Sequence, residues 1–264
     1  MQLASAHAAV IAQPRADAPR ERFADLVAST EPATAAFVRA QLAVAAKRRA
    51  AGRRDRAVEA LAIRCLAPPP EQDARGTGVV TRLLGSSVPA SLQRMAWGRG
   101  FLERLTVDAV WFTQRGPELM ALAPIVDVTV HLSPCDPEEL FDSPAWTHVR
   151  SLRFVGPPLA MPVITALTRS PYLSRLAMLD LSYARLPEAA IHLVAEAGGL
   201  GGLKYLIAAG NGFPDVNRSV DEEDGVVYGE KASQFAAQLA TRHGARPWFN
   251  GIPSELEPHP ETFG

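Results

Sequence analysis

The chain has 264 residues, of which 47% are apolar, so it is long enough to bury a sizeable core. Its formal net charge is −1, which argues against a nucleic-acid binder of the usual basic kind. Two cysteines, Cys65 and Cys135, are too few for a disulfide framework and favour a reducing compartment. No apolar run approaches the length that crosses a membrane, and no basic region precedes the short apolar stretch at the N-terminus. We therefore expect a cytoplasmic protein with no membrane partner.

The first third of the chain, residues 1–67, is predicted to be helical. Asp17 and Thr30 stand where they would cap two of its helices, and three prolines at 68–70 end the last one. Apolar residues recur at helical spacing in four stretches, 2–13, 20–29, 30–50 and 55–67.

Residues 68–98 show no clean hydrophobic period and begin with the loop-like sequence PPPEQDARGTG. We expect a linker that also covers the open end of the elements that follow. Such a cover is needed because the terminal unit of a repeat array otherwise exposes its apolar core.

Residues 99–213 contain a repeat. The spacing apolar-x-x-apolar-x-apolar occurs five times, starting at Leu102, Ile125, Val149, Leu176 and Leu203. The fifth copy, LKYLIAAGNGF, fits the leucine-rich-repeat pattern L-x-x-L-x-L-x-x-N-x-L with Asn211 in the asparagine position. A period of 20–29 residues with this pattern predicts one short strand and one return segment for each unit. We therefore expect an α/β fold, a short and irregular leucine-rich-repeat solenoid of about five repeats after the helical region.

Within each repeat the three apolar residues are expected to point inward, and the return segments are expected to be short helices. The four helical return segments are predicted at 117–124, 136–144, 160–171 and 187–199.

The remainder, 214–264, is predicted to hold an acidic loop or short hairpin and a helix over 230–244 that ends at Gly244. Trp248 and Phe249 are expected to cap the last repeat.

Two stretches resemble a known bacterial family. RGFLERLTV (99–107) looks like the strand that joins a repeat-companion domain to its repeats. The segment 9–43 resembles the repeat-companion domain itself through Pro14, Asp17, Pro19, Arg20, Phe23, Ala24, Asp25, Ala36, Phe37, Arg39, Gln41 and Leu42. The chain departs from the family at Leu26, where a Trp is usual, and lacks the acidic-Arg-Gly segment that commonly follows. The resemblance implies a cytoplasmic, non-enzymatic protein and supplies no catalytic residues. A Leu- and Ile-rich helical protein without repeats is the alternative.

No motif points to catalysis or to a metal. Asp136 follows Cys135 and precedes Pro-Glu, so it is predicted to cap a helix rather than to assist the thiol. The six histidines show neither H-x-x-x-H nor H-E-x-x-H spacing, and no G-x-S-x-G elbow occurs. We expect no cofactor, no metal and no enzymatic activity. The alternative is an enzyme with an unrecognised site in residues 68–100 or in the C-terminal tail.

The outward positions of the predicted strands form the best candidate for a binding surface, on the concave side of a solenoid. They should align in three columns, with polar residues first and more apolar residues toward the last repeats. Binding hot spots favour Tyr and Arg. We predict contacts with another protein, as an adaptor, regulator or target in a bacterial system, through Arg104, Thr129, His131, Arg153, Met178, Asp180, Tyr205 and Ile207. An ordinary solvated sheet face is the alternative.

A basic run is the sharpest charge feature of the sequence. It comprises Lys47, Arg48, Arg49, Arg53 and Arg54. The run could bind an acidic partner or nucleic acid. The flanking chain lacks aromatic residues for base stacking, so a solvated helix end and loop is the favoured interpretation.

Overall fold

The protein is described by a computed structural model that shows an α/β fold. The described residues are 2–51, 94–213, 219–221, 225–227 and 230–249. Six strands form one sheet in the order β1-β2-β3-β4-β5-β6, and β7 and β8 form a separate two-stranded sheet. The predicted helix at 55–67 and most of the predicted linker lie outside the described residues. None of the described helices is both long and apolar enough to cross a membrane.

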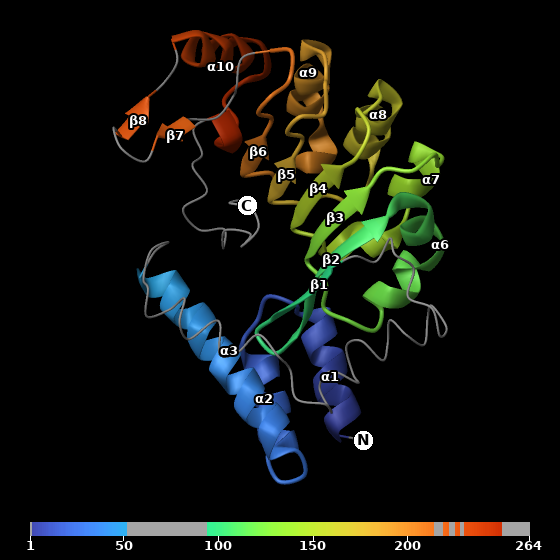
Figure 1. Ribbon diagram of the computed structural model, residues 1–264, viewed down its shortest axis with the longest axis vertical. Coiled ribbons are helices and arrows are strands. Elements are labelled where there is room, and N and C mark those ends of the chain that lie inside the picture. The colour runs from blue at the N-terminus through green and yellow to red at the C-terminus, as the bar shows by residue number, and fades with distance from the viewer. Residues whose placement is uncertain (1, 52–93, 214–218, 222–224, 228–229, 250–264) are drawn as a thin grey trace. The chain divides into compact units, whose positions relative to one another are not determined.

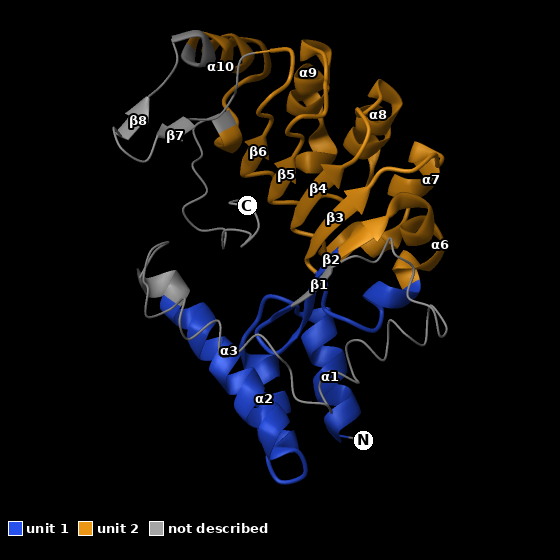
Figure 2. Ribbon diagram, in the orientation of Figure 1, with its two compact units in different colours: residues 1–105, 118–125, 253–264 blue, residues 106–117, 126–252 orange. Residues whose placement is uncertain are grey.

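The chain divides into two compact units (Figure 2). Unit 1 contains the described residues up to Leu105 together with Glu118–Ile125, and unit 2 contains Thr106–Pro117 and the described residues from Val126 onward. The division differs from the segments predicted from the sequence, because the first residues of the repeat region belong with the N-terminal helices.

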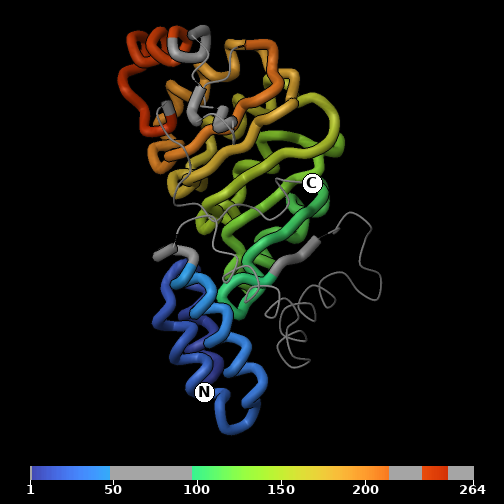
Figure 3. Tube along the Cα trace, turned by 60° about the vertical axis from the view of Figure 1, so that its left-hand side comes forward, coloured from blue at the N-terminus to red at the C-terminus, as the bar shows by residue number. Residues whose placement is uncertain are grey.

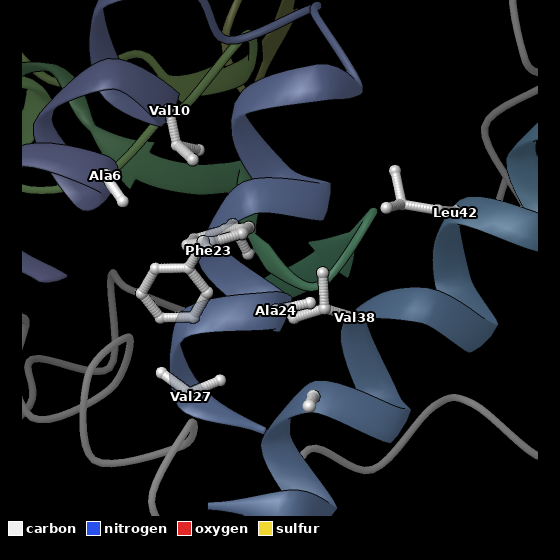
Figure 4. Packing of buried hydrophobic residues seen from close by; sticks show 9 residues of the cluster. Ala6, Val10, Phe23, Ala24, Val27, Val38 and Leu42 are labelled. Carbon is white, nitrogen blue, oxygen red and sulfur yellow. The ribbon is translucent and has the colours of Figure 1, made fainter. Parts of the chain in front are cut away.

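Unit 1 packs three helices against a β-hairpin. The helices are α1 (Gln2–Ala12), α2 (Ala18–Val27) and α3 (Pro32–Ala51), as predicted to within a few residues. The hairpin consists of β1 (Arg94–Gly98) and the start of β2 (Phe101–Asp108). Its core contains Ala6, Val10, Phe23, Ala24, Val27, Ala35, Val38, Leu42 and Phe101 (Figure 4). The rings of Phe23 and Phe101 meet edge to face at 5.0 Å, so the hairpin contributes directly to the helical core.

The two predicted N-caps of unit 1 have other roles. Asp17 is the N-cap residue of α2 by position, but its side chain makes no capping hydrogen bond and its Oδ1 lies 3.6 Å from Arg99 Nη1. The prediction for Thr30 was wrong. Its hydroxyl donates to the carbonyl of Val27 at the end of α2, and α3 begins two residues later at Pro32. Proline suits that first turn because its fixed φ is helical and its missing N–H has no partner there.

The turn between β1 and β2 requires a glycine. Arg99 and Gly100 both have left-handed backbones, with φ of 47° and 86°, as a tight two-residue hairpin turn demands. A Cβ on Gly100 would lie 2.6 Å from Val38 Cγ2, so helix α3 approaches the turn closely. The amide of Gly100 donates to Gln41 Oε1 at 2.7 Å, which also ties the turn to α3.

Unit 2 alternates parallel strands with return helices. The strands are β3 (Asp127–His131), β4 (Ser151–Val155), β5 (Met178–Asp180) and β6 (Tyr205–Ile207). The return segments contain α7 (Pro137–Phe141), the 3₁₀ turn η1 (Pro144–His148), α8 (Met161–Arg169), α9 (Glu188–Glu196) and the 3₁₀ turn η2 (Gly198–Leu200). The helices lie along one side of the strands, and successive turns of the trace stack on one another (Figures 1 and 3).

All fifteen residues of the five apolar triplets are buried, which confirms that they point inward. Each has at most 8% of its surface exposed. The triplets are Leu102, Leu105 and Val107; Ile125, Val128 and Val130; Val149, Leu152 and Phe154; Leu176, Leu179 and Leu181; Leu203, Leu206 and Ala208. Twelve of the fifteen belong to unit 2, and its core therefore lies between the strands and the return helices.

The first return helix starts earlier than predicted. Helix α6 spans Ala109–Met120 and accommodates Pro117, whereas the sequence suggested a start at 117. The reason is Asp108, whose Oδ1 accepts from the amides of Val110 and Trp111 at 2.9 and 3.2 Å. Asp108 thus acts as an N-cap and supports a helix that begins directly at the end of β2.

The C-terminal elements agree with their predictions. Strands β7 (Ser219–Asp221) and β8 (Gly225–Val227) form an antiparallel hairpin in the acidic segment. Helix α10 (Glu230–His243) is followed by Gly244 with φ of 77°, as a helix C-terminus favours. The 3₁₀ turn η3 (Pro247–Phe249) contacts β6, and Trp248 is buried. The turn η3 therefore packs against the last strand of the sheet, as predicted for Trp248, whereas the side chain of Phe249 lies outside the described residues.

Candidate interaction surface

The strand face is the side of β3–β6 opposite the return helices. The pairing of the strands aligns its residues in the predicted columns. Asp127, Ser151, Met178 and Tyr205 form one row of register partners, and Thr129, Arg153, Asp180 and Ile207 form the next. His131 pairs with Val155 at the carboxyl ends of β3 and β4. The spacing of the sequence thus identified which residues lie side by side.

An ion pair occupies the middle of the strand face. The Nε and Nη2 atoms of Arg153 both lie 2.8 Å from Asp180 Oδ2, and the two side chains are 22% and 7% exposed. Asp180 Oδ1 accepts in addition from the amide of Ser182 at 3.0 Å. The two residues were predicted as separate partner contacts. In the structure the two side chains neutralise each other and Asp180 is buried, while their contact with a partner stays a prediction.

The other predicted contact residues differ in how much surface they offer. Thr129 is buried, as is its neighbour Ser151 in the adjacent row. Met178, Tyr205 and Ile207 are partly exposed and lie on adjacent strands at the C-terminal end of the sheet. These three residues form a partly exposed and largely apolar part of the predicted surface. Arg104 and His131 are also partly exposed, but Arg104 belongs to unit 1.

Sequence reasoning missed the most exposed aromatic side chain of the described residues. Tyr183 is 78% exposed and has a left-handed backbone with φ of 56°. Its amide donates to the carbonyl of Ala209 at 2.7 Å, which holds this conformation. A Cβ on Gly210 would come within 2.3 Å of the tyrosine ring, so the ring lies directly on a glycine. The sequence signal for this arrangement was a tyrosine at 183 and a glycine at 210, which stand at corresponding positions after β5 and β6.

Tyr183 belongs to an exposed rim at the carboxyl ends of the strands. Val155 is 39% exposed, and Pro157 and Pro158 follow it on the surface. The amide of Leu159 donates to the carbonyl of Ala184 at 3.0 Å, so the proline segment lies beside the tyrosine turn. We call Val155, Pro157, Pro158 and Tyr183 the apolar rim.

The basic run is only partly described. Lys47 is exposed on α3, which agrees with a solvated helix end. The side chains of Arg48 and Arg49 and all of Arg53 and Arg54 lie outside the described residues. Binding by this run stays a prediction.

A pocket of about 310 Å³ lies between α7 and α8. Its lining includes Glu138, Glu139, Asp142 and Arg169 around the buried side chain of Phe141. Ser170, which also lines the pocket, donates to the carbonyl of Phe141 at 2.7 Å and is thereby satisfied. In the part of the chain that the structure describes, no three His, Cys, Asp or Glu side chains gather as metal ligands.

Cys135 is not set up as a nucleophile. Burial raises the pKa of its thiol, and the carboxylates of Asp108, Asp136 and Glu139 raise it further. A reactive cysteine needs the opposite, a pKa lowered by nearby positive charge. Asp136 Oδ1 accepts from the amide of Glu138 at 2.9 Å, which confirms the predicted helix cap.

A scan against protein-family models and searches of curated proteins and of solved structures returned no match to the chain.

Proposed function

We propose that the chain is a cytoplasmic, leucine-rich-repeat-like solenoid that binds another protein through its strand face. Unit 1 would be the repeat-companion region that precedes the repeats. In this proposal the protein acts as an adaptor, regulator or target within a bacterial system, with no enzymatic activity of its own. The observation that carries the proposal is the parallel register of β3–β6 over a row of buried apolar triplets at repeat spacing.

The side chain of Asn211 supports the repeat assignment. Its Nδ2 donates to the carbonyls of Leu181 and Ala208 at 3.0 and 2.8 Å, and its Oδ1 accepts from the amide of Leu186 at 3.0 Å. The side-chain amide of Asn211 therefore satisfies backbone groups that follow β5 and a backbone group that follows β6. That is a physical reason for an asparagine at this position of a stacked repeat.

The composition of the surface supports a protein partner over a small molecule. The strand face offers Met178, Tyr205 and Ile207, and the apolar rim offers Tyr183 beside two prolines. Aromatic residues, Met and Arg are enriched where proteins bind one another, and a few such residues carry most of the affinity. The neutral Arg153–Asp180 pair adds a polar group that a partner can contact without burying a lone charge.

The test is capture of the partner from native lysate, followed by binding measurements with the captured protein. The double variant Tyr205→Ala/Arg153→Ala should lose most of the recovery, and Tyr183→Ala should weaken it if the rim takes part. Tyr172→Ala is the matched control because this partly exposed tyrosine lies between α8 and β5 and outside strands β3–β6. Equal recovery by the double variant and the control would overturn the strand face as the binding surface.

A further inference from the structure

Two histidines from distant parts of unit 2 are hydrogen-bonded to each other. His192 Nδ1 on α9 lies 2.8 Å from His243 Nε2 at the end of α10, and the ring centroids are 5.1 Å apart. The two residues are 51 positions apart in the sequence. Such a bond requires one ring nitrogen to donate and the other to accept, so at least one of the two rings must be neutral.

Carboxylates lie beside the outer nitrogens of both rings. His192 Nε2 is 3.4 Å from Glu188 Oε1, and His243 Nδ1 is 3.7 Å from Glu196 Oε1. Both glutamates are on α9 and are 56% exposed. The positive charges of Arg242 and Arg246 act on His243 as well. Glu188 and Glu196 can thus balance one positive charge that the two rings share. If both rings were protonated, two positive charges would face each other at hydrogen-bond distance.

The inner nitrogens are too close together for a single bound metal ion. A tetrahedral zinc ion with its ligands at 2.0–2.1 Å would hold two imidazole nitrogens about 3.3 Å apart. The observed 2.8 Å is instead an ordinary hydrogen-bond length. The arrangement therefore points to proton chemistry rather than to metal binding.

The histidine pair is one of the contacts that hold α10 on α9. Phe235 and Leu239 of α10 are buried, and Phe235 packs against Phe213 with ring centroids 6.0 Å apart. Beyond the helix, Arg246 Nη2 donates to the carbonyl of Ala195 at the end of α9. The side chain of His243 is 5% exposed, so water reaches little of a charge placed on it while the end of α10 stays in place.

We propose that His192 and His243 form a proton-sensitive latch, which holds the C-terminal end of α10 on α9 while at least one ring is neutral and releases it when both rings become protonated. Release would also loosen the segment that leads to η3, which contacts β6. The latch depends only on the packing of unit 2, so it stands whether or not the strand face binds a partner.

The direction of the pH effect follows from the proton balance. Burial lowers the pKa of His243 below its ordinary 6.5, His192, Arg242 and Arg246 lower it further, and Glu196 partly opposes them. The released state therefore binds a proton more readily than the latched state. Latching is fully present above about pH 6.5 and weakens as the pH falls below it.

The test is amide hydrogen exchange of the full chain, expressed as protection factors so that the intrinsic pH dependence of exchange cancels. Protection at the end of α10 should fall by roughly tenfold or more between pH 7.5 and 5.5. The reason is that two positive charges at hydrogen-bond distance repel by more free energy than a tenfold change in the equilibrium between docked and released α10 requires. In His243→Gln, whose amide can replace Nε2 but does not titrate, this fall should disappear.

His148→Gln is the matched control. Burial also lowers the pKa of His148, but it lies in η1 and not at α10, so its replacement should leave the pH response of α10 unchanged. If α10 does not dock on α9 in His243→Gln, proton NMR titration of the His192 and His243 rings in the wild type tests the proposal instead. Wild-type protection that does not depend on pH, a response retained in His243→Gln, or two rings that titrate independently near 6.5 would each overturn the latch.

Discussion

The guanidinium of Arg20 on α2 is paired with the carboxylate of Glu103 on β2, although 83 residues separate them in the sequence. Arg20 is fully buried, lies over the Phe101 ring and also donates to the carbonyl of Pro14 at 2.7 Å. Arg99 reaches the same carboxylate at 2.9 Å. The hairpin thus supplies the counter-charge for an arginine of the helices, which explains why both belong to unit 1.

Removal of the charge on Glu103 should destabilise unit 1 strongly. Burial is the main reason that the pKa of Arg20 is lowered to about 10, and Glu103 opposes this effect. Glu103→Gln leaves a buried cation without its partner, for which a loss of about 3–5 kcal/mol is expected in denaturant unfolding. Asp25→Asn is the control, because the Arg39–Asp25 pair is 51% and 71% exposed and should contribute about 0.2–1 kcal/mol. Similar losses in both variants would contradict the structural role of Glu103.

Asn211 should be needed for the stability of the segments that follow β5 and β6. Asn211→Ala leaves two carbonyls and one amide of the backbone without their side-chain partner, and an unsatisfied buried group costs about 1–3 kcal/mol. Asn211→Asp keeps the acceptor for Leu186 but loses both donated bonds, so it separates the two contributions. Thermal unfolding and exchange at Leu181–Leu186 measure the effect. A variant as stable as wild type would argue that water replaces the amide.

Trp146 in η1 should be a main contributor to the core of unit 2. It is fully buried, its ring centroid lies 4.4 Å from that of Phe112, and its Nε1 donates to the carbonyl of Leu140 at 2.6 Å. Trp146→Ala should cost about 3–5 kcal/mol. Trp146→Phe should cost less because it keeps ring packing but loses the hydrogen bond. Trp111→Phe, at a partly exposed position on α6, is the control, and urea unfolding followed by circular dichroism is the measurement.

The fold could be predicted from the sequence wherever one physical signal dominated. The apolar triplets identified the buried side of each strand because burial is the main requirement at those positions. The start of α6 was missed because nothing in the sequence distinguished Asp108 from other polar residues as a helix cap. The contact of Arg20 with Glu103 left no local signal, since a pair between α2 and β2 depends on how the hairpin folds back onto the helices.

The candidate surface was predictable in register but not in exposure. Spacing placed Arg153 beside Asp180, yet it could not show that the two charges pair and that Asp180 becomes buried. Tyr183 was missed because its exposure depends on a left-handed backbone and on the absence of a side chain at Gly210. The histidine pair escaped motif searches for the same kind of reason, because its members come from separate helices.

Cys135 should react slowly with thiol reagents, and its charged neighbours should be part of the reason. Burial and the carboxylates of Asp108, Asp136 and Glu139 raise its pKa, so at pH 7.5 less thiolate is present than at an ordinary cysteine. In a Cys65→Ser background, alkylation should be slower than that of a free cysteine peptide, and its rate should keep rising at higher pH. Glu139→Gln removes one exposed carboxylate without touching the cap at Asp136, and it should speed the reaction modestly. Alkylation as fast as in the peptide would contradict the raised pKa, whereas a rate unchanged by Glu139→Gln would leave the effect to burial and to the carboxylates of Asp108 and Asp136.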